Sequence, residues 1–349
     1  MLAFVASLAL LATGCQGAAK IPLHPSTAPA SPAVNPASES AGANEASGVS
    51  SGVLFGGNAP LALESSKLGR NLAIVRVYYH IGQPFPGGPA TDPSANGPST
   101  KAILNRGSTL LVSMDSNNSG PSYASIISGR YDTSILTFLT SVNEAAVQHH
   151  LPAIYICFEH EPENYSHLHL GSPQQFVKAW DHIHALAARA HLNWNDGGYL
   201  HWVWIMIHSA FNSNGGASLW FPGRQEVDIV GVDGYNSYAC RLARHAANAK
   251  QGQATPKSIF NPALNFALTH GKLPLFISEW GSDPQPAGTQ VGFIHEMESY
   301  VNANPEIGAV LYWDSPGVGC NYSINGQLAS ISAMTTLAHS GRLQGRLTK

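Results

Sequence analysis

Two glutamates follow apolar runs at distant points in the sequence, and together they could carry out acid–base and nucleophilic chemistry. Glu161 lies within Glu159-His160-Glu161-Pro162-Glu163, directly after one apolar run. Glu279 follows Phe276-Ile277-Ser278, a second such run. Burying a carboxylate beside apolar side chains is costly unless it has a partner or a function. Two carboxylates that face each other can hydrolyse a glycosidic bond, one as nucleophile and the other as acid and then base.

The residues alone leave other interpretations open. Glu159 and Glu163 each lie two residues from Glu161, and either is the working acid if the strand ends elsewhere. A single Glu after a strand is commonly a solvated loop residue or a charge at a helix amino terminus. A metal site of the H-E-x-x-H type would need a second His where Asn164 stands. We therefore expect neither a metal nor a cofactor.

Eight short runs rich in β-branched and aromatic residues could position these glutamates. They occupy residues 53–55, 73–79, 109–114, 153–159, 201–207, 228–232, 273–278 and 309–313. Their near-continuous apolar character is typical of parallel strands buried on both faces, and helical stretches separate several of them. One stretch opens with Ser172-Pro173-Gln174-Gln175, a capping-box pattern. The sequence predicts a (β/α)8 barrel, a TIM barrel, as a single catalytic domain over residues 52–349.

The barrel prediction places both glutamates at one mouth, because catalytic groups of such barrels gather at the carboxyl ends of the strands. Glu161 follows the fourth predicted strand and Glu279 the seventh. A doubly wound open sheet is the alternative fold. No G-x-G-x-x-G follows an early strand, which argues against that alternative.

Composition and the first residues indicate the compartment and the partner. Charged residues make up 11% of the chain and the net charge is -3, which favours a neutral partner over nucleic acid. Residues 2–11 form an apolar stretch of signal-peptide length, and Ala12-Thr13-Gly14-Cys15 resembles a bacterial lipobox. A plain secretory signal with a chance Cys is the alternative. Residues 16–51, poor in large apolar side chains, predict a disordered tether.

We therefore expect residues 1–15 to be a signal peptide whose Cys15 receives lipid, in an exported bacterial lipoprotein at the cell surface or outside the cell. The anchor at Cys15 would be its only membrane contact, and we expect a monomer that binds a polysaccharide.

The motifs at the strand ends, taken together, resemble glycoside hydrolase family 26, in clan A. The resemblance covers roughly residues 52–340 and rests on Phe158-Glu159-His160-Glu161, Trp202-Val203-Trp204, Val230-Gly231-Val232-Asp233-Gly234-Tyr235-Asn236, Phe276-Ile277-Ser278-Glu279-Trp280-Gly281 and Tyr312-Trp313, with Ile127-Ser128-Gly129-Arg130-Tyr131-Asp132. It implies Glu161 as acid/base and Glu279 as nucleophile of a retaining enzyme. Among the residues that it implies in substrate binding are His160, Tyr235, Trp280 and Trp313, although barrel packing would also explain Tyr235 and Trp313.

The resemblance implies an endo-acting β-glycanase whose default substrate is β-1,4-mannan, with β-1,3-xylan and mixed-linkage β-glucan as alternatives. Members often have His-Glu-Met-Asn where this chain has His-Glu-Pro-Glu, with Asn164 one step later. A tryptophan common soon after the acid has no counterpart near Ser166, where Tyr165 or His167 could substitute. A non-catalytic glycan-binding lipoprotein and a surface adhesin remain alternative functions.

Three cysteines lie within the predicted barrel. Cys240 is in the loop after the sixth strand and Cys320 in the loop after the eighth, both at the catalytic mouth, whereas Cys157 is inside the fourth strand. Export permits oxidation. We predict a Cys240–Cys320 disulfide and a free, buried Cys157.

Overall fold

The computed structural model describes residues 49–86, 97–116, 120–164, 166–212, 214, 216–237, 240, 253–317 and 319–347. The predicted signal peptide with Cys15, and the predicted tether up to residue 48, lie outside the described residues. Among the residues described, no helix has both the length and the apolar character needed to cross a membrane.

Eight parallel strands form a closed barrel, and their order around it follows the order of the chain. The barrel strands are β2 (Leu54–Asn58), β3 (Ile74–His80), β4 (Thr109–Asp115), β5 (Ile154–Phe158), β6 (Leu200–Ile207), β7 (Ile229–Asn236), β8 (Leu275–Ser282) and β9 (Ile307–Tyr312). Each of the eight predicted runs overlaps one strand, and the predicted (β/α)8 barrel is confirmed.

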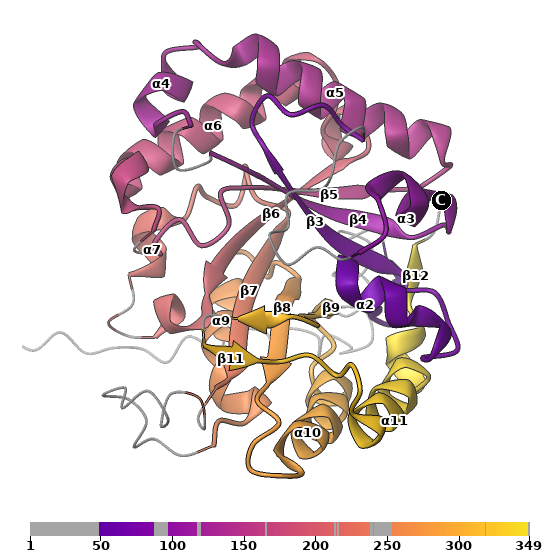
Figure 1. Ribbon diagram of the computed structural model, residues 1–349. Coiled ribbons are helices and arrows are strands. Elements are labelled where there is room, and N and C mark those ends of the chain that lie inside the picture. Colours follow the sequence, from indigo (N-terminus) through magenta and orange to yellow (C-terminus); the bar gives the residue numbers. More distant parts are fainter. Residues whose placement is uncertain are drawn as a thin grey trace, which may run out of the picture. The chain divides into compact units, whose positions relative to one another are not determined.

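Helices cover the outside of this barrel, with α5 and α6 on one side and α10 and α11 on the opposite side (Figure 1). The α-helices are α2 (Ala59–Leu63), α3 (Thr100–Asn105), α4 (Tyr123–Ile127), α5 (Asp132–Gln148), α6 (Pro173–Arg189), α7 (Ala217–Trp220), α9 (Pro256–Thr269), α10 (Thr289–Ala303) and α11 (Leu328–Ala338). Short 3-10 helices are η1 (Glu64–Ser66), η2 (Leu168–Leu170), η3 (Trp194–Asp196), η4 (His208–Phe211) and η6 (Gly341–Gln344). The capping box predicted at Ser172 opens α6, where the Ser172 side chain accepts from the Gln175 amide.

Strand side chains alternate between two buried clusters. One cluster fills the barrel interior and includes Ile74, Leu111, Tyr155 and Phe276. The other lies between the strands and the helices and is larger. Because side chains two apart on a strand share a face, the strand residues that follow the interior cluster point into the barrel mouth.

Two small antiparallel strand pairs complete the described structure. Strand β1 (Val49–Ser51) pairs with β12 (Arg346–Leu347), so three residues of the predicted tether belong to the folded structure. Strand β10 (Pro316–Gly317) pairs with β11 (Cys320–Asn321) in the loop that follows β9. The first pair joins the two ends of the described chain, and the second forms part of the barrel mouth.

Candidate active site

A local irregularity in β8 decides where Glu279 points. The register of β8 against β9 shifts between Ile277 and Trp280. Regular alternation from the interior residue Phe276 would turn residue 279 outward, but the shift turns Glu279 into the mouth and Trp280 away from it. The irregularity therefore presents one carboxylate at the carboxyl end of the seventh barrel strand.

Three side chains from β3 and β7 hold the carboxylate of Glu279. The hydroxyls of Tyr78 and Tyr235 each donate a hydrogen bond to it, one to each oxygen. Nη1 of Arg76 lies 2.8 Å from its Oε1. Burial raises the pKa of both phenols, so Tyr78 and Tyr235 keep their protons and act as donors. Glu279 is thus fixed in position by two hydrogen bonds and one ion pair.

Arg76 also binds a second carboxylate, that of Asp233. Its Nη1 lies 3.0 Å from each oxygen of Asp233, and its Nε donates to the hydroxyl of Ser113 at 3.2 Å. Arg76 and Asp233 are 1% and 0% exposed. A charge buried to this extent needs a paired counter-charge, so the pair fixes the guanidinium under Glu279.

Glu161 lies just beyond β5, in a backbone conformation that few residues other than glycine adopt. Its φ is 49°. Its amide donates to the carbonyl of Ile205 at 3.0 Å, and the Asn164 side chain donates to its Oε2 at 2.9 Å. Strained backbone of this kind persists where the surrounding structure enforces it, often at active sites.

Burial and the charge of Glu279 raise the pKa of Glu161 to about 7. The carboxyl is therefore held partly protonated near neutral pH, as an acid that donates a proton must be. Glu279, by contrast, is surrounded by donors. Two carboxyl groups whose environments differ in this way suit the acid and nucleophile of one reaction.

The two rival glutamates have other partners. Glu159 is fully buried and accepts from the Ser116 amide, while Glu163 accepts from the Ile207 amide at 2.7 Å. Burial raises the pKa of each to about 8; the next-largest effect for Glu159 is the charge of Asp115. The charge of Glu279 raises the pKa of Glu161, whereas it is not among the causes that raise the pKa of Glu159 or Glu163.

Aromatic rings border the two glutamates. The ring of His160 meets the edge of Tyr78 at 5.3 Å, and Trp313 meets Tyr78 at 6.1 Å. Trp313 is partly exposed, so its ring is accessible to a sugar. Burial and the charge of Arg76 lower the pKa of His160, which keeps its imidazole neutral. His167, named as a possible substitute for the missing tryptophan, donates from its Nδ1 to the Glu161 carbonyl at 2.9 Å. Tyr165 lies outside the described residues.

Trp280 lies outside the barrel mouth, where a substrate-binding side chain would have to be exposed. Its side chain is fully buried, with its ring 4.8 Å from that of Tyr312 and 6.2 Å from that of Phe293 in α10. A side chain without exposed surface has no face for a sugar. The same shift that turns Glu279 inward buries Trp280, so we do not retain it as a substrate-binding residue.

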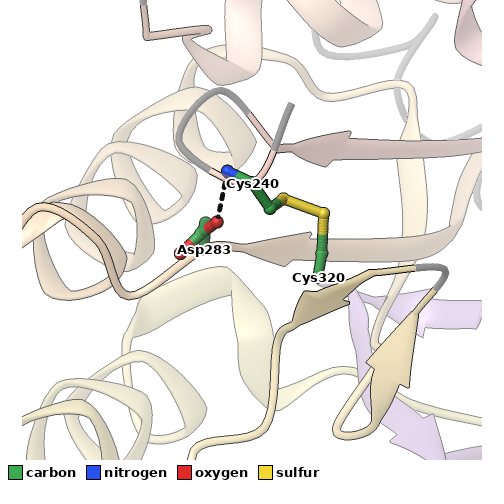
Figure 2. A group of neighbouring side chains, drawn as sticks. All are labelled: Cys240, Asp283 and Cys320. Atoms are coloured by element: carbon green, nitrogen blue, oxygen red, sulfur yellow. Dashed lines mark hydrogen bonds between the residues drawn. A yellow bond between two sulfur atoms is a disulfide. The ribbon is translucent and has the colours of Figure 1, made fainter. Parts of the chain in front are cut away.

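Cys240 and Cys320 are joined by a disulfide whose Cα atoms are 5.4 Å apart, and Cys157 is a free thiol buried inside the barrel. Figure 2 shows Asp283 beside the bridge, where its Oδ2 accepts from the Cys240 amide at 2.9 Å. The two sulfurs and an Asp283 oxygen lie within 4.8 Å of one another, but bonded sulfurs offer no thiolate to a metal.

The disulfide also contacts the candidate site indirectly, through two stacked rings. Cys240 and Cys320 pack with Tyr322, and Tyr235 stacks on Tyr322 with ring centres 4.7 Å apart. The bridge therefore supports the ring whose hydroxyl donates to Glu279.

Sequence motifs alone missed three residues of this site as functional groups, namely Arg76, Tyr78 and Asp233. Arg76 and Tyr78 are two apart on β3, as Asp233 and Tyr235 are on β7, so each pair shares the inward face. A charged residue within an otherwise apolar strand was the available signal, because such a residue needs a buried partner.

No protein-family model matches the sequence, and no curated protein matches it. Solved structures do resemble the fold. A modular endo-β-1,4-mannanase of glycoside hydrolase family 26 from Cellulomonas fimi has 14% identity and a TM-score of 0.55, over 83% of this chain and 71% of that one. The catalytic domain of a family 26 endo-β-1,4-mannanase from a Bacillus species has 15% identity and a TM-score of 0.56, over 84% and 86%.

A family 26 domain of an endo-β-mannanase/endo-β-glucanase from Prevotella bryantii has 12% identity and a TM-score of 0.50, over 84% of this chain and 91% of that one. Likeness at these identities shows a shared fold. These three structures are described as members of the family that the strand-end motifs resemble.

Proposed function

We propose that this chain is a retaining glycoside hydrolase that cleaves a neutral polysaccharide with Glu279 as nucleophile and Glu161 as acid/base. One observation carries the proposal: a carboxylate held by two phenol hydroxyls and a guanidinium raises, by its charge and together with burial, the pKa of a second carboxyl to about 7. That contrast supplies the two protonation states that double displacement requires.

In the first step, Glu279 attacks the anomeric carbon while Glu161 gives its proton to the departing glycosidic oxygen. The products are a glycosyl ester on Glu279 and a shortened chain that leaves. In the second step, Glu161 takes a proton from water, and the water attacks the same carbon to release the sugar and free Glu279. Tyr78, Tyr235 and Arg76 keep the nucleophile oriented through both steps.

For the substrate we propose β-1,4-mannan, cut within the chain. The C. fimi and Bacillus structures that share the fold are described as endo-β-1,4-mannanases, which supports this choice. A neutral glycan also fits a chain with 11% charged residues. The partly exposed Trp313 offers the flat apolar face on which a sugar ring stacks.

A reducing-sugar assay on a panel of glycans tests both levels of the proposal. Release from mannan above β-1,3-xylan and mixed-linkage β-glucan supports the mannanase assignment, whereas preference for either of the other two retains the hydrolase and corrects the substrate. Glycan binding without release from any member would instead support a non-catalytic glycan-binding protein. Glu279→Ala, assayed in parallel, shows that the release comes from this site.

For localisation we propose export and lipid attachment at Cys15, supported by the lipobox-like Ala12-Thr13-Gly14-Cys15. Expression in a bacterium with labelled palmitate provides the test. Label in the wild type that is absent from Cys15→Ser supports attachment, and equal labelling or no labelling of both would contradict it.

A further inference from the structure

The amino-terminal end of the barrel, opposite the glutamates, carries a cavity of about 560 Å³ with a basic lining. Arg70, Arg106, Arg346, His149 and His150 contribute to its walls. These residues precede barrel strands β3, β4 and β5 or belong to β12. None of the described residues that line it is acidic, so the cavity suits an anionic group.

Arg70 and Arg106 donate hydrogen bonds to backbone carbonyls. Arg70 donates to the carbonyls of Ala338 and Leu343 at 2.7 and 3.1 Å, and Arg106 donates to the carbonyl of Ala62 at 3.2 Å. Carbonyls orient a guanidinium without neutralising it. Burial, and after it the nearby charge of Arg346, lowers the pKa of Arg70. Two cations held close together would be stabilised by an anion between them.

A second cavity of about 530 Å³ adjoins the first and has an aromatic and apolar lining. The two share His150, Leu151 and Pro152. Trp194 and Val147 belong to the second cavity, and they are 37% and 51% exposed. We refer to the linings of the two cavities together as the basic-aromatic face.

The basic-aromatic face lies beside the two ends of the described chain. Arg346 and Leu347 line the first cavity and form β12, which pairs with β1. The described chain therefore joins the barrel beside the basic-aromatic face. The seven residues of β3 span about 20 Å, which separates this face from the mouth that holds Glu279.

We propose that the basic-aromatic face docks on a membrane surface rich in anionic phospholipid. Lipid phosphates enter the arginine-lined cavity, and Trp194 inserts at the level of the headgroups, where tryptophan is favoured. This arrangement directs the mouth away from the membrane, toward a glycan. The docking goes beyond glycan hydrolysis, does not depend on it, and adds a second membrane contact to the lipid anchor expected at Cys15.

Sedimentation with vesicles tests the docking in the full chain carrying Cys15→Ala, which removes any lipid anchor from every sample. The vesicles are phosphatidylcholine alone or phosphatidylcholine with phosphatidylglycerol. The variants are Arg106→Ala, Arg106→Ala with Arg346→Ala, and Trp194→Ala, each checked for folding by thermal unfolding. Arg130→Ala, an exposed arginine between α4 and α5 at the opposite end of the barrel, is the matched control.

We expect binding to phosphatidylglycerol vesicles that exceeds binding to phosphatidylcholine alone and weakens with salt. Each arginine removed from the face should weaken it about fivefold, with Arg130→Ala unchanged. Trp194→Ala should weaken binding while leaving its salt dependence in place. Equal binding to both vesicle types, or an equal loss in Arg130→Ala, would overturn the proposal. The proposal would also be overturned if inorganic phosphate stabilised the protein in an Arg106-dependent way and the protein did not bind vesicles. The cavity would then serve a soluble anion.

Discussion

Nη1 of Arg76 lies 2.8 Å from the carboxylate of Glu279, and the same nitrogen lies 3.0 Å from both oxygens of Asp233. One buried cation from the second barrel strand therefore serves two carboxylates, from the sixth and seventh strands. Without it, two negative charges would face each other in a region shielded from water. The stability of the barrel mouth and the position of the Glu279 carboxylate thus depend on the same side chain.

Removing this cation should destabilise the fold. For Arg76→Met we expect the free energy of unfolding to fall by about 3–5 kcal/mol, because the carboxylates of Asp233 and Glu279 lose their buried counter-charge. Urea unfolding followed by fluorescence measures the change. Adding Asp233→Asn should restore part of the loss. A single variant within about 1 kcal/mol of the wild type would refute the role given to Arg76.

Replacing either proposed catalytic glutamate should nearly abolish hydrolysis. Glu161→Ala and Glu279→Ala should each reduce kcat by about a thousandfold or more while leaving circular dichroism unchanged, because each removes one of the two reacting groups. Glu163→Gln is the control, since Glu163 accepts from the Ile207 amide and the charge of Glu279 is not among the causes that raise its pKa. If Glu163→Gln were the inactive protein, the acid would have been assigned to the wrong glutamate.

The pH dependence of hydrolysis should report the raised pKa of Glu161. Since Glu161 must be protonated to donate, kcat/KM should decline as the pH rises through about 7. The charge of Glu279 contributes to this pKa, so Glu279→Gln should lower it. NMR titration of labelled glutamate carboxyls measures it without activity. An unchanged pKa in Glu279→Gln would mean that the two groups do not interact.

Glu159 should make the fold less stable as the pH rises. Its pKa is raised to about 8 in the folded chain, so the folded state binds the proton more tightly than the unfolded state. The stability this gives is complete below the unfolded pKa of about 4.3 and is lost as the pH rises through about 8. Between pH 5 and pH 8.5 the free energy of unfolding of the wild type should fall further than that of Glu159→Gln, by at least about 1 kcal/mol. Parallel curves of unfolding free energy against pH would contradict this.

Hydrolysis should proceed with retention at the anomeric carbon. Double displacement on Glu279 inverts that centre twice, so the first product has the anomeric configuration of the substrate. Proton NMR spectra recorded within the first minutes show that product before it mutarotates. An inverted first product would exclude a glycosyl ester on Glu279 and would require the water-activating arrangement of a single displacement.

Much of the fold of this protein can be predicted from local sequence patterns. The eight apolar runs predict the barrel because strands buried on both faces need continuous apolar side chains, and all eight became strands. The capping box at Ser172 was predictable because it depends on residues three apart. Placing Glu161 and Glu279 at one mouth also needed only their positions after strands four and seven, since parallel strands end on the same side.

Other features depend on residues far apart in the chain, and only the tertiary structure decided them. Arg76 donates to Asp233, which lies 157 positions away in the sequence, and no residue near Arg76 in the chain indicates that partner. Alternation would have turned Glu279 outward, and a register shift against β9 placed it inward and buried Trp280 instead. The different surroundings of Glu159, Glu161 and Glu163 likewise come from residues of β4, β6 and β8. Local sequence sets which face a side chain prefers, whereas the charge and burial it finds there come from strands that only folding brings together.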